Sequence, residues 1–279
     1  MTALAFTLIV LAISALAGFL GALTGLGGGV VVVPALTLLL GVDIKYAIGA
    51  SLVSVIATSS GAAAAYVREG FSNIRIGMLL EIATTLGAIA GAVLAAHIST
   101  HAIAIVFGLV LLQAAWQSFE RSQTSSTASA SSDALARRFR LDGSYPLGNV
   151  RQPYGVRNVP AGFGLMVGAG VLSGLLGIGS GAMKVIAMDR VMKIPFKVST
   201  TTSNFMIGVT AAASAGVYLS RGYIDPHVAM PVMLGVLCGA FLGSRVLVRA
   251  RVHTLRLVFG CVVLALALEM IVNGMLGRV

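Results

Sequence analysis

Two glycine clusters interrupt long apolar stretches at matching places in the two halves of the chain. Glycine lets the backbone turn and approach a ligand closely, and a broken helix leaves unpaired N–H groups at the start of the next segment. Such a helix start favours an anion, and paired broken helices are typical of transporter binding sites. The alternative is close helix packing through small residues. We predict that the two clusters form an anion site from Gly25, Gly27, Gly28, Gly29, Gly177, Gly179, Ser180 and Gly181.

Hydroxyl and amide side chains follow both glycine clusters inside apolar segments. Such groups can line a polar cavity and donate hydrogen bonds to the oxygens of an anion. They are also common as hydrogen bonds between helices or to the carbonyl of the preceding turn. The candidates for the cavity are Ser51 in the first half and Thr202, Ser203 and Asn204 in the second.

Two ionisable residues lie within apolar segments, where an isolated charge is costly and therefore points to function. Lys184 follows Gly181 by three positions and either supplies a counter-charge to the anion or extends to the membrane surface. Glu81 stands between Leu80 and Ile82 and either relays a proton or pairs with a cation. The spacing of His, Cys, Asp and Glu predicts no metal site and no cofactor.

The composition places these residues in a membrane protein. The chain has 279 residues, of which 57% are hydrophobic and 10% charged. Its mean hydropathy is +0.97. These values exclude an ordinary soluble enzyme and predict an all-α, polytopic integral membrane protein. The net charge of +10 comes from basic residues between apolar segments, which indicates the positive-inside bias rather than nucleic-acid binding. Cys238 and Cys261 lie in apolar segments and are expected to be inert core residues.

The sequence contains an internal repeat at an offset of 152 positions. The offset superimposes the glycine clusters and continues over about 80 residues. It predicts two homologous transmembrane repeats, 1–118 and 161–279, joined by a flexible, basic cytoplasmic linker, 119–160. Further matched pairs are Lys45 with Lys197, Ser51 with Ser203, Thr58 with Thr210, Tyr66 with Tyr218 and His101 with His253.

The repeats predict about eight to ten membrane segments with broken helices. The expected segments are 3–24, 30–41, 46–66, 74–96 and 102–118, followed by 161–176, 182–192, 198–219, 227–247 and 255–275. The second segment of each half is too short to cross, since 11 residues of helix rise only about 16 Å against about 30 Å of hydrocarbon. Matched turns differ in Lys and Arg content, which predicts repeats inserted upside down relative to each other, with both termini outside.

The duplicated glycine motif, with Pro34 after its first copy, and the Gly49-Ala50-Ser51 and Thr202-Ser203 segments resemble the TauE/SafE family of sulfite and organosulfonate exporters. The resemblance implies transport of small sulfur-containing anions coupled to an ion gradient, with Pro34 near the site. The second motif departs from the pattern, because Ser180 replaces a glycine and Ile186 stands at the position equivalent to Pro34.

The sequence thus predicts a secondary transporter, and not an enzyme, in the cytoplasmic membrane. We expect export of sulfite or an organosulfonate by alternating access between the repeats. The expected partners are the small anion, H⁺ as the coupling ion, the lipid bilayer and a second copy of the chain, without nucleic acid. The alternatives are an anion channel with the same pore, a transporter of a different small anion, a membrane-embedded enzyme and an assembly subunit.

Overall fold

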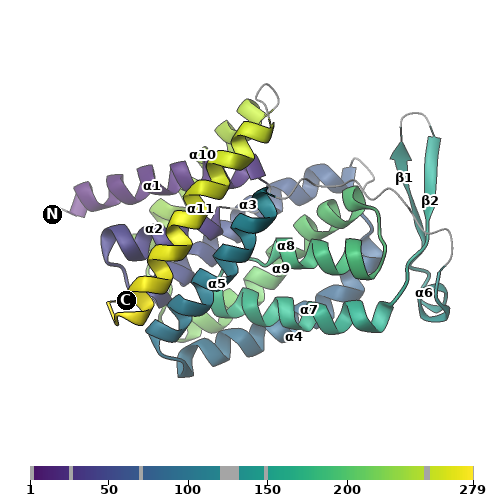
Figure 1. Cartoon of the computed structure of the whole chain (residues 1–279), viewed down its shortest axis with the longest axis horizontal. Helices are drawn as coiled ribbons and strands as arrows, with labels where there is room; N and C mark the ends of the chain where they lie inside the picture. The colour runs from purple at the N-terminus through teal and green to yellow at the C-terminus, as the bar shows by residue number, and fades with distance from the viewer. Residues whose placement is uncertain are drawn as a thin grey trace.

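A computed structural model describes residues 3–24, 28–68, 72–119, 132–147, 150–247 and 252–278. Helices dominate both halves (Figure 1), as the composition predicts. The first half contains α1 (Ala3–Thr24), α2 (Gly29–Leu40), α3 (Ile44–Arg68), α4 (Ile74–His97) and α5 (Thr100–Phe119). The second half contains α7 (Val159–Leu176), α8 (Gly181–Ile186), a π-helical turn (Ala187–Val191), α9 (Phe196–Ser220), α10 (Pro226–Leu247) and α11 (Val252–Met275).

Length and composition identify helices that could cross a membrane. Within the described ranges, six helices are long and apolar enough to do so, namely α1, α4, α5, α7, α10 and α11. Helices α3 and α9 have 25 residues each and carry many hydroxyl and small side chains, and Ser51, Ser54, Ser203 and Thr210 are among the buried ones. Helix α2 has only 12 residues, so it rises about 18 Å and ends inside the hydrocarbon thickness of about 30 Å.

The two halves exchange equivalent contacts. Helix α1 packs along α10 while its counterpart α7 packs along α4, and α3 and α5 pack on their own counterparts, α9 and α11. At residue level, a side chain at Gly18 would overlap the Val236 carbonyl, and one at Gly170 would overlap the Thr84 carbonyl. These two contacts are equivalent under the repeat, because Gly170 is the counterpart of Gly18 and Thr84 is the counterpart of Val236. The same relation links the Gly239 contact on Ala15 with the Gly87 contact on Val167.

This symmetry of contacts is what a twofold arrangement of repeats requires. It gives the glycines of these helices a packing role, because their missing side chains let backbones approach closely. The opposite orientation of the two repeats in the membrane stays a prediction.

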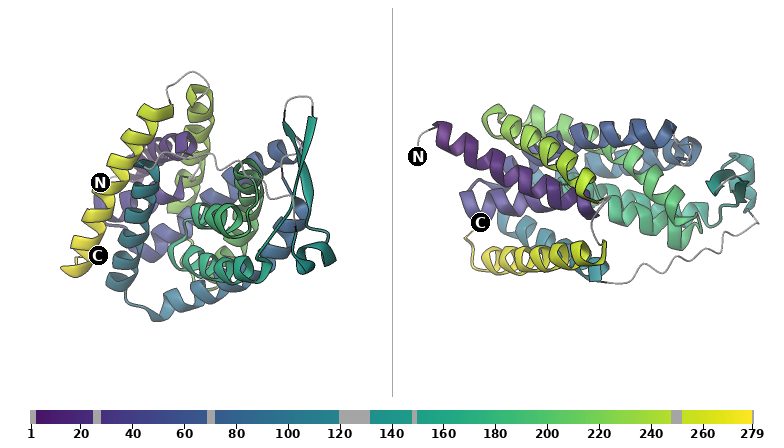
Figure 2. Two further views of the ribbon diagram at one scale, coloured as in Figure 1. Left: turned by 45° about the vertical axis from the view of Figure 1, so that its right-hand side comes forward. Right: turned by 90° about the horizontal axis from the view of Figure 1, so that it is seen from above.

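The linker is more ordered than its composition predicts. Residues 132–147 and 150–158 form a cap at one end of the bundle, with a short helix α6 (Ala134–Arg138) and an antiparallel pair of strands, β1 (Gly143–Leu147) and β2 (Val150–Tyr154) (Figure 2). The expectation of a flexible connector is wrong for these residues. Buried apolar side chains of the cap, including Leu141 and Tyr154, pack with Ile76 and Leu80 of α4. The Asn73 side chain donates to the Tyr154 hydroxyl over 2.8 Å and to the Leu141 carbonyl over 3.0 Å.

The two cysteines are not core residues. Both side chains are free and exposed on the outer surface of the bundle, which corrects the prediction of inert core positions. Helix α10 turns Val232, Val236 and Gly239 toward the interior, and this stripe leaves Cys238 on the opposite side.

The contact between α4 and α7 provides a test of the packing. We expect Gly87→Leu to lower the free energy of unfolding by about 1–3 kcal/mol or more, as overpacking substitutions do. The new side chain would overlap the backbone of α7 at Val167. The control is Gly168→Leu on α7, since Gly168 faces open space. Thermal unfolding of both variants in the same detergent measures the difference. Equal losses in the two variants would show that close approach at Gly87 is unimportant.

Candidate functional site

The second glycine cluster breaks the helical path between α7 and α8. Helix α7 ends at Leu176, its C-cap Gly177 has a left-handed φ of 68°, and Gly179 follows with a φ of 71°. Ser180 also lies in the left-handed region, with a φ of 44°, before the chain re-enters a helix at Gly181. Residues other than glycine rarely adopt this backbone conformation, and those that do cluster at functional sites. Ser180 is therefore a notable departure from glycine at this position.

The two glycine clusters meet in the folded protein. The Ser51 hydroxyl of α3 donates a hydrogen bond to the Gly177 carbonyl over 2.9 Å. Gly29 begins α2 at the same place, where a Cβ atom would lie 2.6 Å from the Ser51 hydroxyl and 3.3 Å from the Gly177 oxygen. Gly28 precedes it in a helical conformation. Gly25 and Gly27, which the sequence assigns to the same site, lie outside the described residues.

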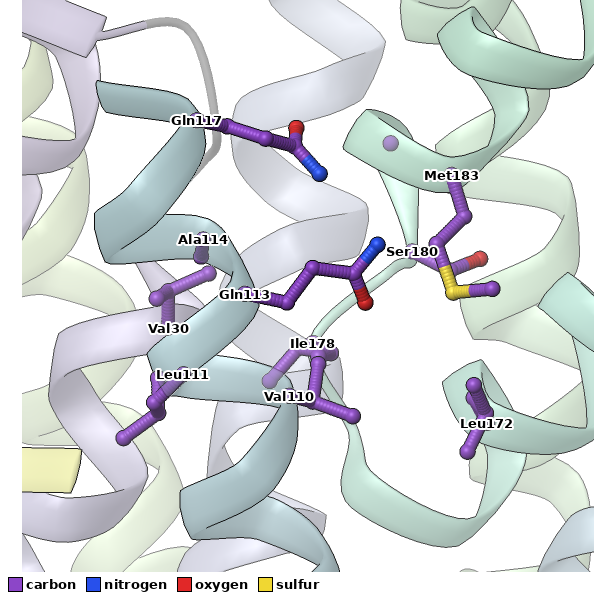
Figure 3. A pocket seen from close by; sticks show the side chains of 11 residues that line it. Val30, Val110, Leu111, Gln113, Ala114, Gln117, Leu172, Ile178, Ser180 and Met183 are labelled. Atoms are coloured by element: carbon purple, nitrogen blue, oxygen red, sulfur yellow. The ribbon is translucent and has the colours of Figure 1, made fainter. Parts of the chain in front are cut away.

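A small, partly open cavity lies beside this meeting point (Figure 3). Its walls come from both halves of the chain: α2 and α5 from the first, and α7, the break and α8 from the second. The lining is mostly apolar, with polar groups from Ser180 and from two glutamines of α5. The residues that line it are Val30, Val110, Leu111, Gln113, Ala114, Gln117, Leu172, Ile178, Ser180, Gly181 and Met183.

The Ser180 hydroxyl is an unused hydrogen-bonding group in this wall. Its side chain is only 5% exposed. Among the described groups, its Oγ has no hydrogen-bond partner. A buried polar atom without a partner is costly and calls for an explanation, such as a ligand or water. Ser180 lines the cavity, and a ligand or water that reached its hydroxyl would find both a donor and an acceptor.

Two glutamines complete the polar part of the cavity, and the sequence analysis did not select them. Gln113 and Gln117 lie one turn apart on α5, and both amides extend toward the space between α5 and α8 (Figure 3). The sequence pattern that could have identified them is their spacing of four residues in an otherwise apolar helix, which places both on one face.

Other predicted site residues surround the breaks without lining the cavity. The Ser203 hydroxyl donates to the Gly181 carbonyl over 3.2 Å. The Thr202 hydroxyl accepts from the backbone N–H of Asn73 over 3.0 Å, on the side of the cap. Pro34 is buried within α2. Asn204 is half-buried on α9. Substrate contact by these four residues stays a prediction.

Lys184 points away from the surface and into a polar cluster. Its side chain is 0% exposed, so the predicted alternative of extension to the membrane surface is wrong. Its Nζ donates to the Thr210 hydroxyl of α9 over 2.6 Å and lies 4.0 Å from Glu81 Oε2 of α4. The Thr210 hydroxyl in turn donates to Glu81 Oε1 over 2.6 Å. Thr210 therefore bridges a buried cation and a buried carboxylate.

The cluster joins the two halves, because Glu81 belongs to the first and Lys184 and Thr210 to the second. Of the two roles predicted for Glu81, the structure shows the pairing with a cation. The Thr85 hydroxyl also donates to Glu81 Oε1, over 3.2 Å, whereas Glu81 Oε2 is buried without a hydrogen bond among the described groups. Within those residues, no group of three or more His, Cys, Asp or Glu side chains could hold a metal ion.

Comparison with known proteins gives this geometry a context. The family model for the sulfite exporter TauE/SafE family matches residues 10–270. The chain belongs to this family. This TauE/SafE protein is 25% identical to the probable membrane transporter protein YunE of Bacillus subtilis strain 168, over 95% of this chain and 97% of the relative. It is 28% identical to the probable membrane transporter protein YdhB of the same organism, over 82% of this chain and 83% of the relative.

A probable membrane transporter protein of Xylella fastidiosa strain 9a5c is 26% identical over 92% of this chain and 91% of the relative. No solved structure matches the chain. The family, the names of these relatives and the apolar helices together identify a multi-pass membrane transporter.

The charge pair provides a test by stability. Removal of one partner leaves the other charge buried alone, so we expect Glu81→Gln and Lys184→Met each to lower the free energy of unfolding by roughly 3–5 kcal/mol. The double variant should lose less than either single variant, because no unpaired charge remains. Thermal unfolding of the wild type, the two single variants and the double variant in detergent gives the double-mutant cycle. A double variant that loses the sum of the two single effects would show that the charges do not interact.

Proposed function

We propose that this TauE/SafE protein is a secondary transporter that exports a small sulfur-containing anion, such as sulfite or an organosulfonate. The proposal is carried by one observation: the cavity lies where the two helix breaks meet and holds the buried, unpartnered hydroxyl of Ser180. Family membership supports transport, and the name of the family points to sulfite.

The lining suits an anion with a compact polar head and an apolar remainder. The Ser180 hydroxyl and the amides of Gln113 and Gln117 can donate hydrogen bonds to sulfur-bound oxygens. The start of α2 at Gly29 adds the partial positive charge of a helix N-terminus. Apolar walls such as Leu172 suit the carbon chain of a sulfonate. Neutral donors hold an anion without a fixed counter-ion, so it can also leave.

Alternating access follows from the two-half construction of the site. Because α2 and α5 form one wall and α7 and α8 the other, a rocking movement between the halves changes access to the cavity. The glycines between α4 and α7 present smooth backbone surfaces that allow such a movement. The site is placed within the cytoplasmic membrane, with the basic cap on the cytoplasmic side.

Counterflow into proteoliposomes tests this function. Vesicles loaded with unlabelled sulfite should take up radiolabelled sulfite saturably, and added sulfonates should compete. We expect Ser180→Ala and Gln113→Leu to weaken the apparent affinity about 10-fold or more, since a hydrogen bond to a charged group contributes about 1.5–3 kcal/mol. Leu112→Ala is the control, because Leu112 lies on α5 with its side chain exposed and outside the cavity lining.

Two results would contradict the proposal. Linear, unsaturable flux without counterflow would identify a channel with the same pore. Absence of counterflow for sulfite and every sulfonate tested, from folded and inserted protein, would exclude this substrate class.

A further inference from the structure

We propose that Glu81 and Lys184 form a proton-coupled anion switch, in which a proton on Glu81 releases Lys184 to bind the transported anion. The inference rests on the proposed function and adds its coupling step. In the structure Lys184 is held by Glu81 and Thr210. Protonation of Glu81 removes the negative charge that holds the ammonium group, and the anion takes its place.

The first support is the arrangement of hydrogen bonds around Thr210. This hydroxyl accepts from Lys184 Nζ and donates to Glu81 Oε1, both over 2.6 Å. A hydroxyl has one proton to donate, so this is the arrangement that serves both charges. Direct contact between the charges is looser, at 4.0 Å, and Glu81 Oε2 is buried without a hydrogen bond among the described groups. This free oxygen is the place for a proton.

The second support is the position of Lys184 relative to the cavity. Ser180 and Gly181 line the cavity, and Lys184 follows them by four and three residues. Lys184 therefore lies about one turn, or about 5.4 Å, farther along α8 than Gly181, with its side chain directed to α9 and α4. Its long, flexible side chain can cover that distance once it is released. The cation is thus beside the anion site but directed away from it.

The third support is the absence of a competing charge around Glu81 in the described part of the bundle. Helix α7, which packs along α4, contains no Asp, Glu, Lys, Arg, His or Tyr. Helix α9 contains Lys197 in its first turn and Tyr218 in its last turns, with Thr210 between them. On α4 itself, Arg75 and His97 lie at the two ends. Lys184 from α8 is therefore the charged group that faces Glu81, and each charge depends on the other.

The resulting cycle conserves charge and protons. A proton binds the Glu81 carboxylate, Lys184 moves to the anion, and the occupied site opens to the other side. There the anion leaves, the proton leaves Glu81, and the ammonium group returns to the carboxylate. One proton therefore moves in the same direction as one anion.

This stoichiometry has a consequence for direction. A dianion with one proton carries one net negative charge, so an inside-negative membrane potential drives it outward. A sulfonate monoanion with one proton is electrically neutral. Its distribution responds to the pH gradient and not to the potential, so an acidic exterior opposes its export, which then runs down the concentration gradient of the sulfonate itself.

The test uses the full-length protein in proteoliposomes with radiolabelled methanesulfonate as the probe. Two measurements are made: counterflow at equal pH, and uptake driven by acid outside. We expect wild type to show both. Glu81→Gln, which resembles the protonated acid, should keep counterflow and lose gradient-driven accumulation at least 10-fold. Glu269→Gln, an exposed acid on α11, is the matched control and should behave as wild type.

Lys184→Met should lose both gradient-driven accumulation and counterflow. Because this variant leaves the Glu81 carboxylate buried alone, the Glu81→Gln/Lys184→Met double variant is included. We expect it to fold and to remain unable to exchange. Accumulation that survives in Glu81→Gln, or counterflow that survives in the double variant, would overturn the switch while leaving the proposed transport function intact.

Infrared spectroscopy tests protonation independently of the substrate. At low pH the wild type should show one carboxylic-acid C=O component, beyond those of the other Asp and Glu side chains, that disappears as the pH is raised and is missing from Glu81→Gln. Lack of such a band would overturn the switch, even if no tested anion is transported. Lack of counterflow in wild type would instead overturn the proposed substrate class.

Discussion

The carbonyl groups freed where α7 ends at its C-cap Gly177 have little water to bind within a membrane, and the structure depends on how they are satisfied. In hydrocarbon, backbone outside a helix is tolerated only where protein groups or a cavity replace the missing hydrogen bonds. Ser51 supplies one of these bonds from the opposite half, and on the other side of the break the Ser203 hydroxyl donates to the Gly181 carbonyl at the start of α8. The break is therefore stabilised from both repeats. The same requirement explains why hydroxyl-rich α3 and α9 lie in the interior and the more apolar helices lie outside.

The break leads directly into the short helix that carries one of the two buried charges, Lys184. Helix α8 carries cavity residues at its start and Lys184 one turn later, where it meets Thr210 and Glu81. A buried ion pair is weak evidence for stability, since desolvation offsets most of the attraction. Its position between a first-half helix and a second-half helix makes function the better explanation. Movement between the halves would change this contact, the cavity and the Ser51–Gly177 hydrogen bond together.

The cap adds a connection between the halves at one end of the bundle. It contacts α4 through Tyr154 and Leu141, and the backbone N–H of Arg157 donates to the Met192 carbonyl over 3.1 Å, just after the π-helical turn. Asn73 also donates from its backbone to Thr202 of α9. The linker thus joins the repeats in space as well as in sequence, and any rocking movement must carry the cap with one half or deform it.

Much of this fold was predictable from local properties. The segment boundaries agree with the structure to within a few residues, because long apolar runs and glycine breaks are local signals that the membrane enforces. The offset of 152 residues also anticipated the exchanged contacts of the halves. The cap was missed because its apolar residues, such as Leu141 and Tyr154, are sparse within a polar segment and acquire meaning only against α4.

The sequence by itself determined the kind of protein, the breaks and the residues able to carry charge in the membrane. Tertiary structure alone decided which of these groups meet. Lys184 could equally have reached an anion or the surface, and only the approach of α4 and α9 directs it to Glu81 and Thr210. Gln113 and Gln117 gained their role in the same way, when α5 was placed opposite the break. The physical reason is that a side chain's partner is set by helices distant in sequence, whose packing no local pattern records.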